Sequence, residues 1–186
     1  SKQSFKTLHD NLIELKEGDL VFVNKNNEVI NLAGVMGGAN TSCKKDTHSV
    51  IVECAYFNPE AITGKAIKYS LQSEAAHKYE RGVDPDCHDY VLRRFLRVIE
   101  EHANITNVEI FSKTYSKFEN KTIKFCEQNI NKILGTKISK EECLKHLKNL
   151  GFNINEMLIN IPLFRHDINS ENDIAEEIAR AVGYNN

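Results

Sequence analysis

The chain has 186 residues, of which 41% are hydrophobic and 27% are charged, a composition typical of a globular protein with one or two compact domains. The 24 basic and 26 acidic residues give a formal net charge of −2, which argues against nucleic-acid binding through bulk positive charge, so any such contact must be local. No apolar run approaches the roughly 18 to 20 residues that span a bilayer, and the amino terminus lacks the apolar segment of a signal peptide.

Two short strands joined by a tight turn are predicted near the start of the chain. They occupy 19–24 and 29–33, and the two asparagines between them tolerate the backbone of a hairpin turn. A third strand is expected at 49–54. Pro59 is well placed to open a short helix that Gly64 interrupts or caps. The first half of the chain therefore predicts a mixed α and β domain.

Glu53 is the one carboxylate inside the apolar run 50–57, which follows a loop with three glycines at 34–40. A carboxylate in an apolar strand needs a partner, because burying an unpaired charge is costly. That partner is either a ligand or, in the alternative interpretation, a basic residue within the sheet.

The segment SEAAHKYERGVDP at 73–85 combines a small-residue turn, a basic and aromatic helix and a Gly/Pro stop. Ser73 is a plausible N-cap, and Ala75 and Ala76 leave room for a ligand to approach the start of the helix. The segment also carries three basic side chains at helical spacing, which can turn toward an anion: His77, Lys78 and Arg81. The alternative is an exposed helix whose charges are merely solvated.

A helix over 86–103 is predicted from apolar residues at helical spacing, and it closes the first domain. Its arginines are interpreted as a solvated face. The polar, aperiodic stretch 112–120 marks a boundary. We therefore expect two domains, 1–115 and 116–186.

The second domain is expected to be a small α+β module. A capping box at 139–142 begins a helix whose C′ residue is Gly151. Two short strands at 152–154 and 158–161 precede a last helix, which begins after Ser170. The order helix, helix, hairpin, helix predicts a winged-helix-like module, and the chain as a whole is assigned to the α+β class.

The last helix carries a group of carboxylates. At about 100° per residue, Asp173, Glu176 and Glu177 are expected on one outward stripe, with Asp167 just ahead of the helix. The opposite, buried stripe is expected to comprise Ile174, Ile178, Ala181 and Val182. Four carboxylates at close range suit a hard cation such as magnesium. Alternatively, Arg180 neutralises the stripe through pairs with Glu176 and Glu177.

Seven collinear segments together carry a resemblance to a known family. In the first half these are NLAGVMGG at 31–38, VECAYF at 52–57, ITG at 62–64 and HKYERGVDP at 77–85. They resemble the post-transfer editing module of the bacterial phenylalanyl-tRNA synthetase beta subunit. In the second half they are IPLFRHDI at 161–168, NDIAEEIAR at 172–180 and VGYNN at 182–186. These resemble the family's next module, which adjoins the catalytic subunit.

The resemblance implies hydrolytic editing of mischarged Tyr-tRNA(Phe), since a pocket made for phenylalanine cannot strongly reject tyrosine. The matching glutamate, Glu53, is implied to sense the para-hydroxyl of tyrosine, while Gly37, Ser73 and Ala75 shape the pocket. No catalytic residue is assigned. The family's upstream histidine-containing segment lies outside this sequence, so we expect impaired hydrolysis, and Ser73 stands where threonine is usual.

The resemblance also implies partners. Asp167, Asp173, Glu176 and Glu177 are implied to hold Mg²⁺ shared with the alpha subunit, in a heterotetramer of two alpha and two beta subunits. The assembled enzyme attaches phenylalanine to tRNA(Phe) with ATP, which this chain is not expected to bind. Five cysteines without a C-x-x-C pair predict neither a disulfide framework nor a zinc ribbon and fit a reducing cytoplasm.

Two other function classes stay open. A non-catalytic scaffold of the same complex would need no polar pocket around Glu53. A free-standing nucleic-acid-binding winged helix would need a basic stripe, which the helix at 139–150 supplies only thinly.

Overall fold

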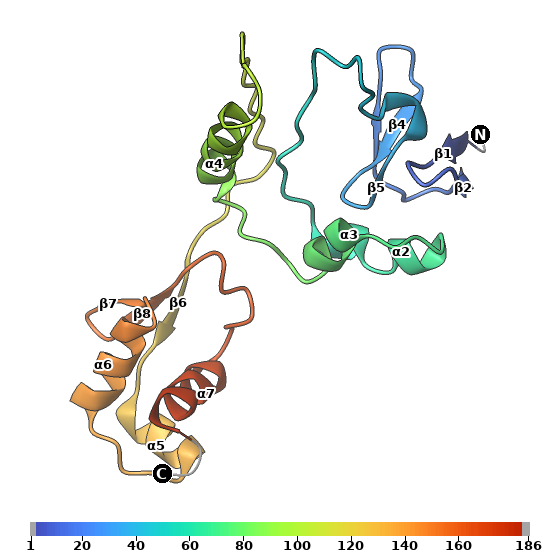
Figure 1. The fold of residues 1–186 in the computed structure, drawn as a ribbon. Coiled ribbons are helices and arrows are strands. Elements are labelled where there is room, and N and C mark those ends of the chain that lie inside the picture. The colour runs from blue at the N-terminus through green and yellow to red at the C-terminus, as the bar shows by residue number, and fades with distance from the viewer. Residues whose placement is uncertain (1–2, 184–186) are drawn as a thin grey trace. The chain divides into compact units, whose positions relative to one another are not determined.

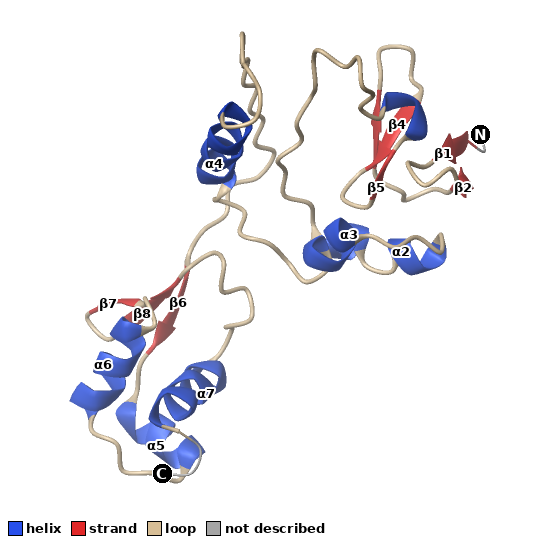
Figure 2. Cartoon of the chain, viewed as in Figure 1, coloured by secondary structure: helices blue, strands red, loops and turns tan. Residues whose placement is uncertain are grey.

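The computed structural model describes residues 3–183, and the chain divides into two compact units (Figure 1). The first unit takes in the chain up to Val83 together with Cys87–Glu101. The second takes in Asp84–Asp86 and the chain from His102 onward. Both units contain helices and short antiparallel strands (Figure 2), so the predicted α+β class is confirmed.

The structure does not test two of the expectations, the domain boundaries and the end of the last matching segment. The division into domains 1–115 and 116–186 stays a prediction. Residues 184–186 of the matching segment 182–186 lie outside the described residues.

The first unit consists of two small antiparallel sheets followed by helices. Its elements are β1 (Gln3–Lys6), β2 (Leu12–Leu15), β3 (Val21–Val23), β4 (Val29–Leu32), β5 (Met36–Gly37), the 3-10 helix η1 (Ala39–Thr41), α1 (Pro59–Ile62), α2 (Lys65–Lys68), α3 (Glu74–Tyr79) and α4 (His88–Glu100). β1 pairs with β2, and the second sheet has the order β3-β4-β5. An isolated antiparallel bridge joins Thr7 to Gly38 and so connects the two sheets.

The predicted hairpin of β3 and β4 is confirmed, and its turn is built by asparagine. The side-chain oxygen of Asn24 accepts hydrogen bonds from the backbone N–H groups of Asn26 at 2.9 Å and Glu28 at 3.0 Å. Asn27 adopts a φ of 61°, a left-handed conformation that asparagine tolerates well. These local bonds set the two strands side by side in antiparallel register.

The core of the first unit lies between the sheets and the first three helices. Its buried residues are Phe5, Ile13, Leu15, Leu32, Ala33, Val35, Phe57, Ile62, Leu71 and Ala76. Gly34 is required where the chain turns into β5, because its φ is 68° and an added Cβ would lie 2.8 Å from the ring of Phe57. The glycine-rich loop is thus packed directly on the core.

The structure corrects one prediction for the first unit and adds two strands that were not predicted. The segment 49–54 forms no strand, and Ile51 within it is 99% exposed. A strand depends on hydrogen bonds to a neighbour, and the ladders among the described residues do not include this segment. Conversely, β1 and β2 were not predicted, although alternate burial of Ile13 and Leu15 in β2 is the period of a half-buried strand.

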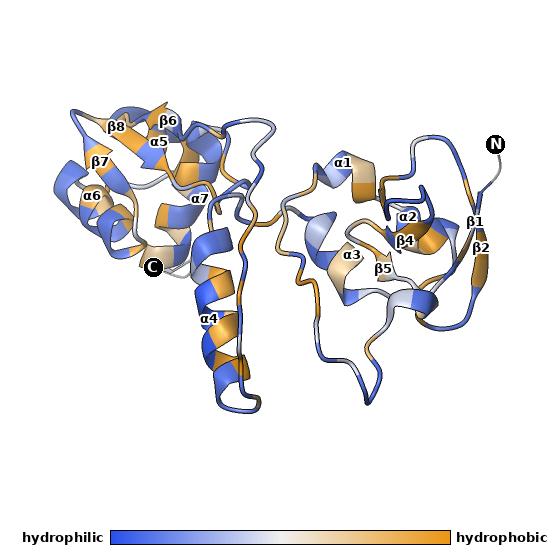
Figure 3. Ribbon diagram, turned by 90° about the horizontal axis from the view of Figure 1, so that it is seen from above, coloured by the Kyte–Doolittle hydropathy of each residue, from blue (hydrophilic) through white to orange (hydrophobic). Residues whose placement is uncertain are grey.

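The predicted helix at 86–103 is confirmed as α4, which begins at His88 and ends at Glu100. Apolar and polar residues alternate along it (Figure 3). None of the residues of α4 is buried, so its apolar side is only partly covered by the described chain.

Asp19 anchors α2 to the strand region. Its side chain is 1% exposed, and it pairs with Lys65 at 2.8 Å and Lys68 at 2.9 Å while Tyr69 donates a further hydrogen bond. Burial by itself would raise the pKa of Asp19, but the hydrogen bonds from Lys65, Tyr69, the Lys16 backbone and Lys68 hold that pKa well below its usual range. A network of contacts across 46 to 50 positions therefore fixes this corner of the unit.

The second unit has one three-stranded sheet covered by three helices. Its elements are β6 (Lys121–Lys124), α5 (Glu127–Leu134), α6 (Lys140–Asn149), β7 (Asn153–Asn155), β8 (Leu158–Ile161) and α7 (Glu171–Val182). The antiparallel sheet has the order β6-β8-β7, and α7 packs against both α5 and α6. The predicted order of two helices, a hairpin and a last helix is present, while β6 was not predicted.

Helix caps in the second unit follow the sequence closely. The Ser139 hydroxyl accepts from the Glu142 backbone N–H at 3.3 Å, and Gly151 has the positive φ expected of a C′ residue. Ser170 and Asp173 form a complete capping box at the start of α7. The core these helices enclose comprises Phe125, Ile130, Cys143, Leu147, Phe152, Ile159, Ile161, Ile168, Ile174, Ala175 and Ile178.

Candidate functional site: the surroundings of α3 and an acidic helix

Ser73 connects the start of α3 to the glycine-rich loop. Its hydroxyl donates a hydrogen bond to the Val35 carbonyl and accepts one from the Ala76 backbone N–H at 3.0 Å, so the predicted N-cap is confirmed. Val35 is two residues before Gly37, where an added Cβ would meet no atom within 4 Å. The structure thus brings Ser73 close to the β5 segment that carries Gly37, with open space at the glycine.

The two alanines at the start of α3 have different environments. Ala76 is buried in the core, whereas Ala75 is exposed. Ala75 therefore lies on the side of the helix that a ligand could approach, and Ala76 packs the helix onto the unit.

Glu53 lies beside the other end of α3. The residue is exposed, yet partial burial of its carboxyl group raises its pKa. Burial raises the pKa of Tyr79, the last residue of α3, and the nearby charges of Glu53 and Cys54 raise it further. The Tyr79 ring packs edge-to-face on Phe57 with centroids 5.0 Å apart. Glu53 therefore lies near the last residue of α3, whereas Ser73 is its N-cap. The helix between them has six residues and is about 9 Å long.

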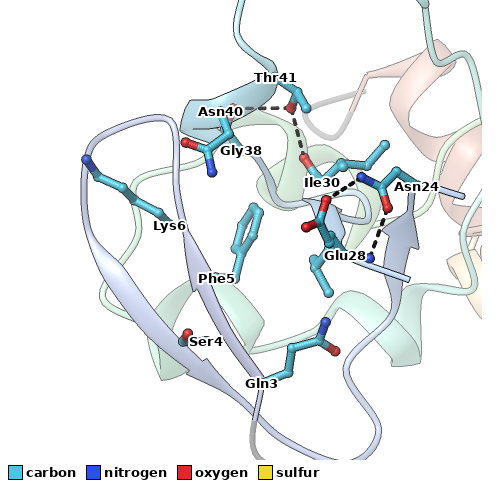
Figure 4. Close-up of a pocket in the computed structure, with 11 residues that line it drawn as sticks. Gln3, Ser4, Phe5, Lys6, Asn24, Glu28, Ile30, Gly38, Asn40 and Thr41 are labelled. Atoms are coloured by element: carbon cyan, nitrogen blue, oxygen red, sulfur yellow. Dashed lines mark hydrogen bonds between the residues drawn. The ribbon is translucent and has the colours of Figure 1, made fainter. Parts of the chain in front are cut away.

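A cavity of about 430 Å³ is lined by residues of β1, of the β3–β4 hairpin and of the segment 38–41 (Figure 4). Phe5 points into it, and polar side chains of Asn24, Glu28 and Asn40 surround it. Gly38 also lines the cavity, and a larger residue would not fit there because an added Cβ would come within 2.7 Å of the Ile30 carbonyl oxygen. None of the residues predicted for the editing pocket lines this cavity.

The acids of the last helix are held by arginine and by backbone groups. Asp167 pairs with Arg165 at 2.7 Å, and Glu176 pairs with Arg180 at 2.7 Å. Hydrogen bonding from Arg165 lowers the pKa of Asp167. Glu177 contacts Arg165 at 2.9 Å and Arg180 at 3.6 Å. The alternative prediction that Arg180 pairs with Glu176 and Glu177 is thus confirmed.

Asp173 has a structural function of its own. One of its carboxylate oxygens accepts hydrogen bonds from the backbone N–H of Asn169 at 2.9 Å, the backbone N–H of Ser170 at 2.8 Å and the Ser170 hydroxyl at 2.9 Å. These bonds, with the Asn169 backbone contact contributing most, lower the pKa of Asp173. The carboxylate belongs to the cap of α7.

The predicted stripes of α7 need correction at two positions. Glu177 does not face outward with the other acids: it is only 6% exposed and lies among Ile174 and Ile178. It is about 60° from Ile174 around the helix, at the border of the two faces, and Arg165 reaches it there. Ala181, expected to be buried, is exposed near the end of the helix.

Carboxylates are suitable ligands for magnesium, but their arrangement here is not that of a metal site. Among residues 3–183, no group of three or more His, Cys, Asp or Glu residues is placed to hold a metal ion. The guanidinium groups of Arg165 and Arg180 take up the oxygens that a cation would need. As they stand in this chain, the four acids do not fit a magnesium ion, and that assignment stays a prediction.

Comparison with known proteins covers both units. Residues 1–104 match the family model of the B3/4 domain, and residues 123–184 match that of the tRNA synthetase B5 domain. The chain is 32% identical, over 99% of its length, to the phenylalanine-tRNA ligase beta subunit of Idiomarina loihiensis. It is 33% identical over 97% of its length to that of Clostridium tetani, and 37% identical over 96% to that of Geobacillus kaustophilus.

The chain belongs to the phenylalanine-tRNA ligase beta subunit family. The resemblance inferred from its sequence motifs is therefore confirmed. It spans 24%, 22% and 23% of the lengths of these three relatives. In the part of the chain that the structure describes, no helix has the length and apolarity needed to cross a membrane.

Two residues that contact the candidate site residues of this beta-subunit chain were not predicted from the sequence. Tyr79 lies in the matching segment 77–85 and packs beside Glu53, yet the motif did not assign it a function. Arg165 precedes Asp167 by two positions, and this spacing was the available signal. Its pairing with Glu177, twelve positions later, becomes visible only in the folded chain.

Proposed function

We propose that this chain is the part of a phenylalanine-tRNA ligase beta subunit that edits mischarged Tyr-tRNA(Phe) and supports assembly with the alpha subunit. The observation that carries the proposal is the collinear match to a B3/4 domain and a B5 domain, together with beta-subunit relatives along 96% to 99% of the chain. Ligase activity, tRNA(Phe), ATP and the partner subunit belong to the whole enzyme in this proposal.

Discrimination in the editing site rests on the extra hydroxyl of tyrosine. The Glu53 carboxyl group is partly desolvated, which makes a hydrogen bond to a ligand hydroxyl more valuable than it would be in water. Tyrosine supplies that hydrogen bond, whereas phenylalanine would leave the acceptor unpaired. Glu53 is thus assigned as a specificity residue.

The other three residues assigned to the pocket, Gly37, Ser73 and Ala75, are suited to positioning the tyrosyl ester. The Ser73 hydroxyl fixes the start of α3 to the glycine-rich loop, and Gly37 and Ala75 leave space beside it. A tyrosyl group bound along α3 would extend from this end of the helix toward Glu53. The proposal assigns the ester to the Ser73 end and the side-chain hydroxyl to the Glu53 end, with water cleaving the ester.

The assembled alpha-beta enzyme provides the test. Glu53→Ala in the full-length beta subunit should let Tyr-tRNA(Phe) accumulate when tyrosine is supplied, while the rate of phenylalanine charging stays nearly unchanged. Glu60→Ala removes an exposed carboxylate from α1 of the same unit and is the matched control. Unchanged clearance of Tyr-tRNA(Phe) by the Glu53 variant would refute its assigned role.

A non-catalytic scaffold remains the second candidate, and one observation favours it. Large apolar side chains are exposed outside the candidate pocket, notably Phe111 at 89% and Tyr115 at 92%. Exposed apolar surface of this kind is typical of interaction sites. If both glutamate variants edit normally while Phe111→Ser weakens subunit association, the scaffold function is the better description.

A further inference from the structure

Arg165 lies between two of the acids that the family resemblance assigns to magnesium. Its Nη2 is 2.7 Å from Oδ2 of Asp167 and 2.9 Å from Oε1 of Glu177. Its Nε donates to Oδ1 of Asp167 at 2.9 Å, and its Nη1 donates to Oε2 of Glu177 at 3.2 Å. One guanidinium nitrogen therefore occupies the space where the two carboxylates converge.

The same side chain is built into the fold of the second unit. Its guanidinium lies 5.6 Å from the ring centroid of Phe152, a core residue that precedes β7. The Arg165 side chain is 20% exposed and the Glu177 side chain 8% exposed, so this ion pair is largely shielded from water. Arg165 thus joins the loop before α7, the inner edge of α7 and the core.

We propose that Arg165 is the resident cation of this acidic group and the positioning residue of α7. In the chain alone, its guanidinium takes the place of a divalent ion between Asp167 and Glu177. Magnesium can bind there only if Arg165 moves away, for example when a partner subunit repacks this surface. The inference refines the metal part of the proposed function and is independent of the editing part.

The proposal divides the four acids by function. Glu177 and Asp173 hold the fold, the first through Arg165 and the second through the capping box of α7. Asp167 and Glu176 are the exposed members, each paired with an arginine. Loss of either fold-holding acid should therefore affect the stability of the chain without any metal or partner present.

The first experiment measures unfolding of the 186-residue chain in urea, with hydrogen exchange of the α7 amides to localise the effect. Arg165→Gln removes the short ion pair of the buried Glu177 and leaves it only the 3.6 Å contact with Arg180, so the folding equilibrium constant of the second unit should fall by about a hundredfold or more. Arg165→Gln combined with Glu177→Gln removes both charges and should recover most of that loss. Arg93→Gln breaks an exposed pair with Asp89 in α4 and is the control, expected to leave α7 exchange unchanged.

Arg165→Lys keeps the experiment informative if the glutamine variant fails to fold. Lysine retains the charge but lacks the planar fork that contacts both carboxylates, so a loss of roughly tenfold is expected. Unchanged α7 exchange in both Arg165 variants would overturn the proposal. Equal losses in the single and double glutamine variants would also overturn it, because the effect would then not arise from Glu177.

The second experiment adds magnesium chloride, with sodium chloride at equal ionic strength as the reference. The unfolding midpoint of the unsubstituted chain should not respond to magnesium, because Arg165 remains in place. The midpoint of Arg165→Gln should rise with magnesium, because the guanidinium that lies between Asp167 and Glu177 is then absent. A magnesium response in the unsubstituted chain, or no response in Arg165→Gln, would show that Arg165 is not the resident cation.

Discussion

The last helices of the two units, α7 and α4, differ in how completely the described chain covers their apolar faces. In the second unit, Ile130, Leu147, Ile159, Ile174 and Ile178 are each 0% exposed, and the last helix packs on two others. In the first unit, α4 buries no residue and the segment 49–54 forms no strand. An amphipathic pattern thus specifies which face of a helix is apolar, whereas a packed core also requires the element that covers that face.

The largest loss of stability is expected for a buried isoleucine of α7, and the same substitution in α4 should cost much less. Ile178→Ala in α7 removes a fully buried side chain and should lower the free energy of unfolding by about 2 to 5 kcal/mol. Ile99→Ala in the half-buried face of α4 should cost less than about 1 kcal/mol. Urea unfolding of both variants checks the comparison, and equal costs would show that α4 is as well packed as α7.

The Asp19 network should make the first unit sensitive to acid. Asp19→Asn loses the charge that pairs with Lys65 and Lys68, and should destabilise the first unit by about 2 kcal/mol at neutral pH. The folded-state pKa of Asp19 is lowered, so its stabilising contribution is present above the ordinary aspartate pKa of about 4. That contribution is lost as the pH falls below this value toward the folded-state pKa.

The pH dependence can be measured by thermal unfolding of the unsubstituted chain and the Asp19→Asn variant. The difference in stability between them should be largest near neutral pH and shrink below about pH 4. A difference that stays constant down to pH 2 would mean that the charge of Asp19 is not what stabilises the unit.

The smallest effects concern the helix caps of the second unit. Ser170→Ala removes one half of a two-sided capping box and should cost about 1 kcal/mol. Ser139→Ala removes a longer hydrogen bond of 3.3 Å and should cost about half as much. Chemical denaturation of the two variants ranks them, and a larger cost at Ser139 would reverse the expected order.

Features fixed by neighbouring residues were predictable from the sequence. The caps at Ser73, Ser139 and Ser170 use hydroxyl groups next to the helices they begin, and the β3–β4 turn uses Asn24 beside its own strands. The same holds for the short helix that Pro59 opens. Local chemistry suffices at such positions.

Features that depend on distant partners were not predictable. The strand expected at 49–54 lacks a paired neighbour, and β6 is recognised through its pairing with β8. Glu177 is buried because Arg165 reaches it, although helical periodicity alone predicted an exposed acid. For the candidate pocket, the sequence motifs indicated the residue types, while the connection of Ser73 to Val35 required the fold.

The most direct test of the central claim is the hydrolysis of preformed Tyr-tRNA(Phe) and Phe-tRNA(Phe) by the assembled alpha-beta enzyme. Hydrolysis of the tyrosyl ester should be strongly preferred, and Glu53→Gln should reduce that preference by at least tenfold, because it removes the charged acceptor while preserving side-chain size. If the Glu53→Gln enzyme retains the full preference for Tyr-tRNA(Phe), Glu53 does not select the hydroxyl and the proposed editing site is wrong.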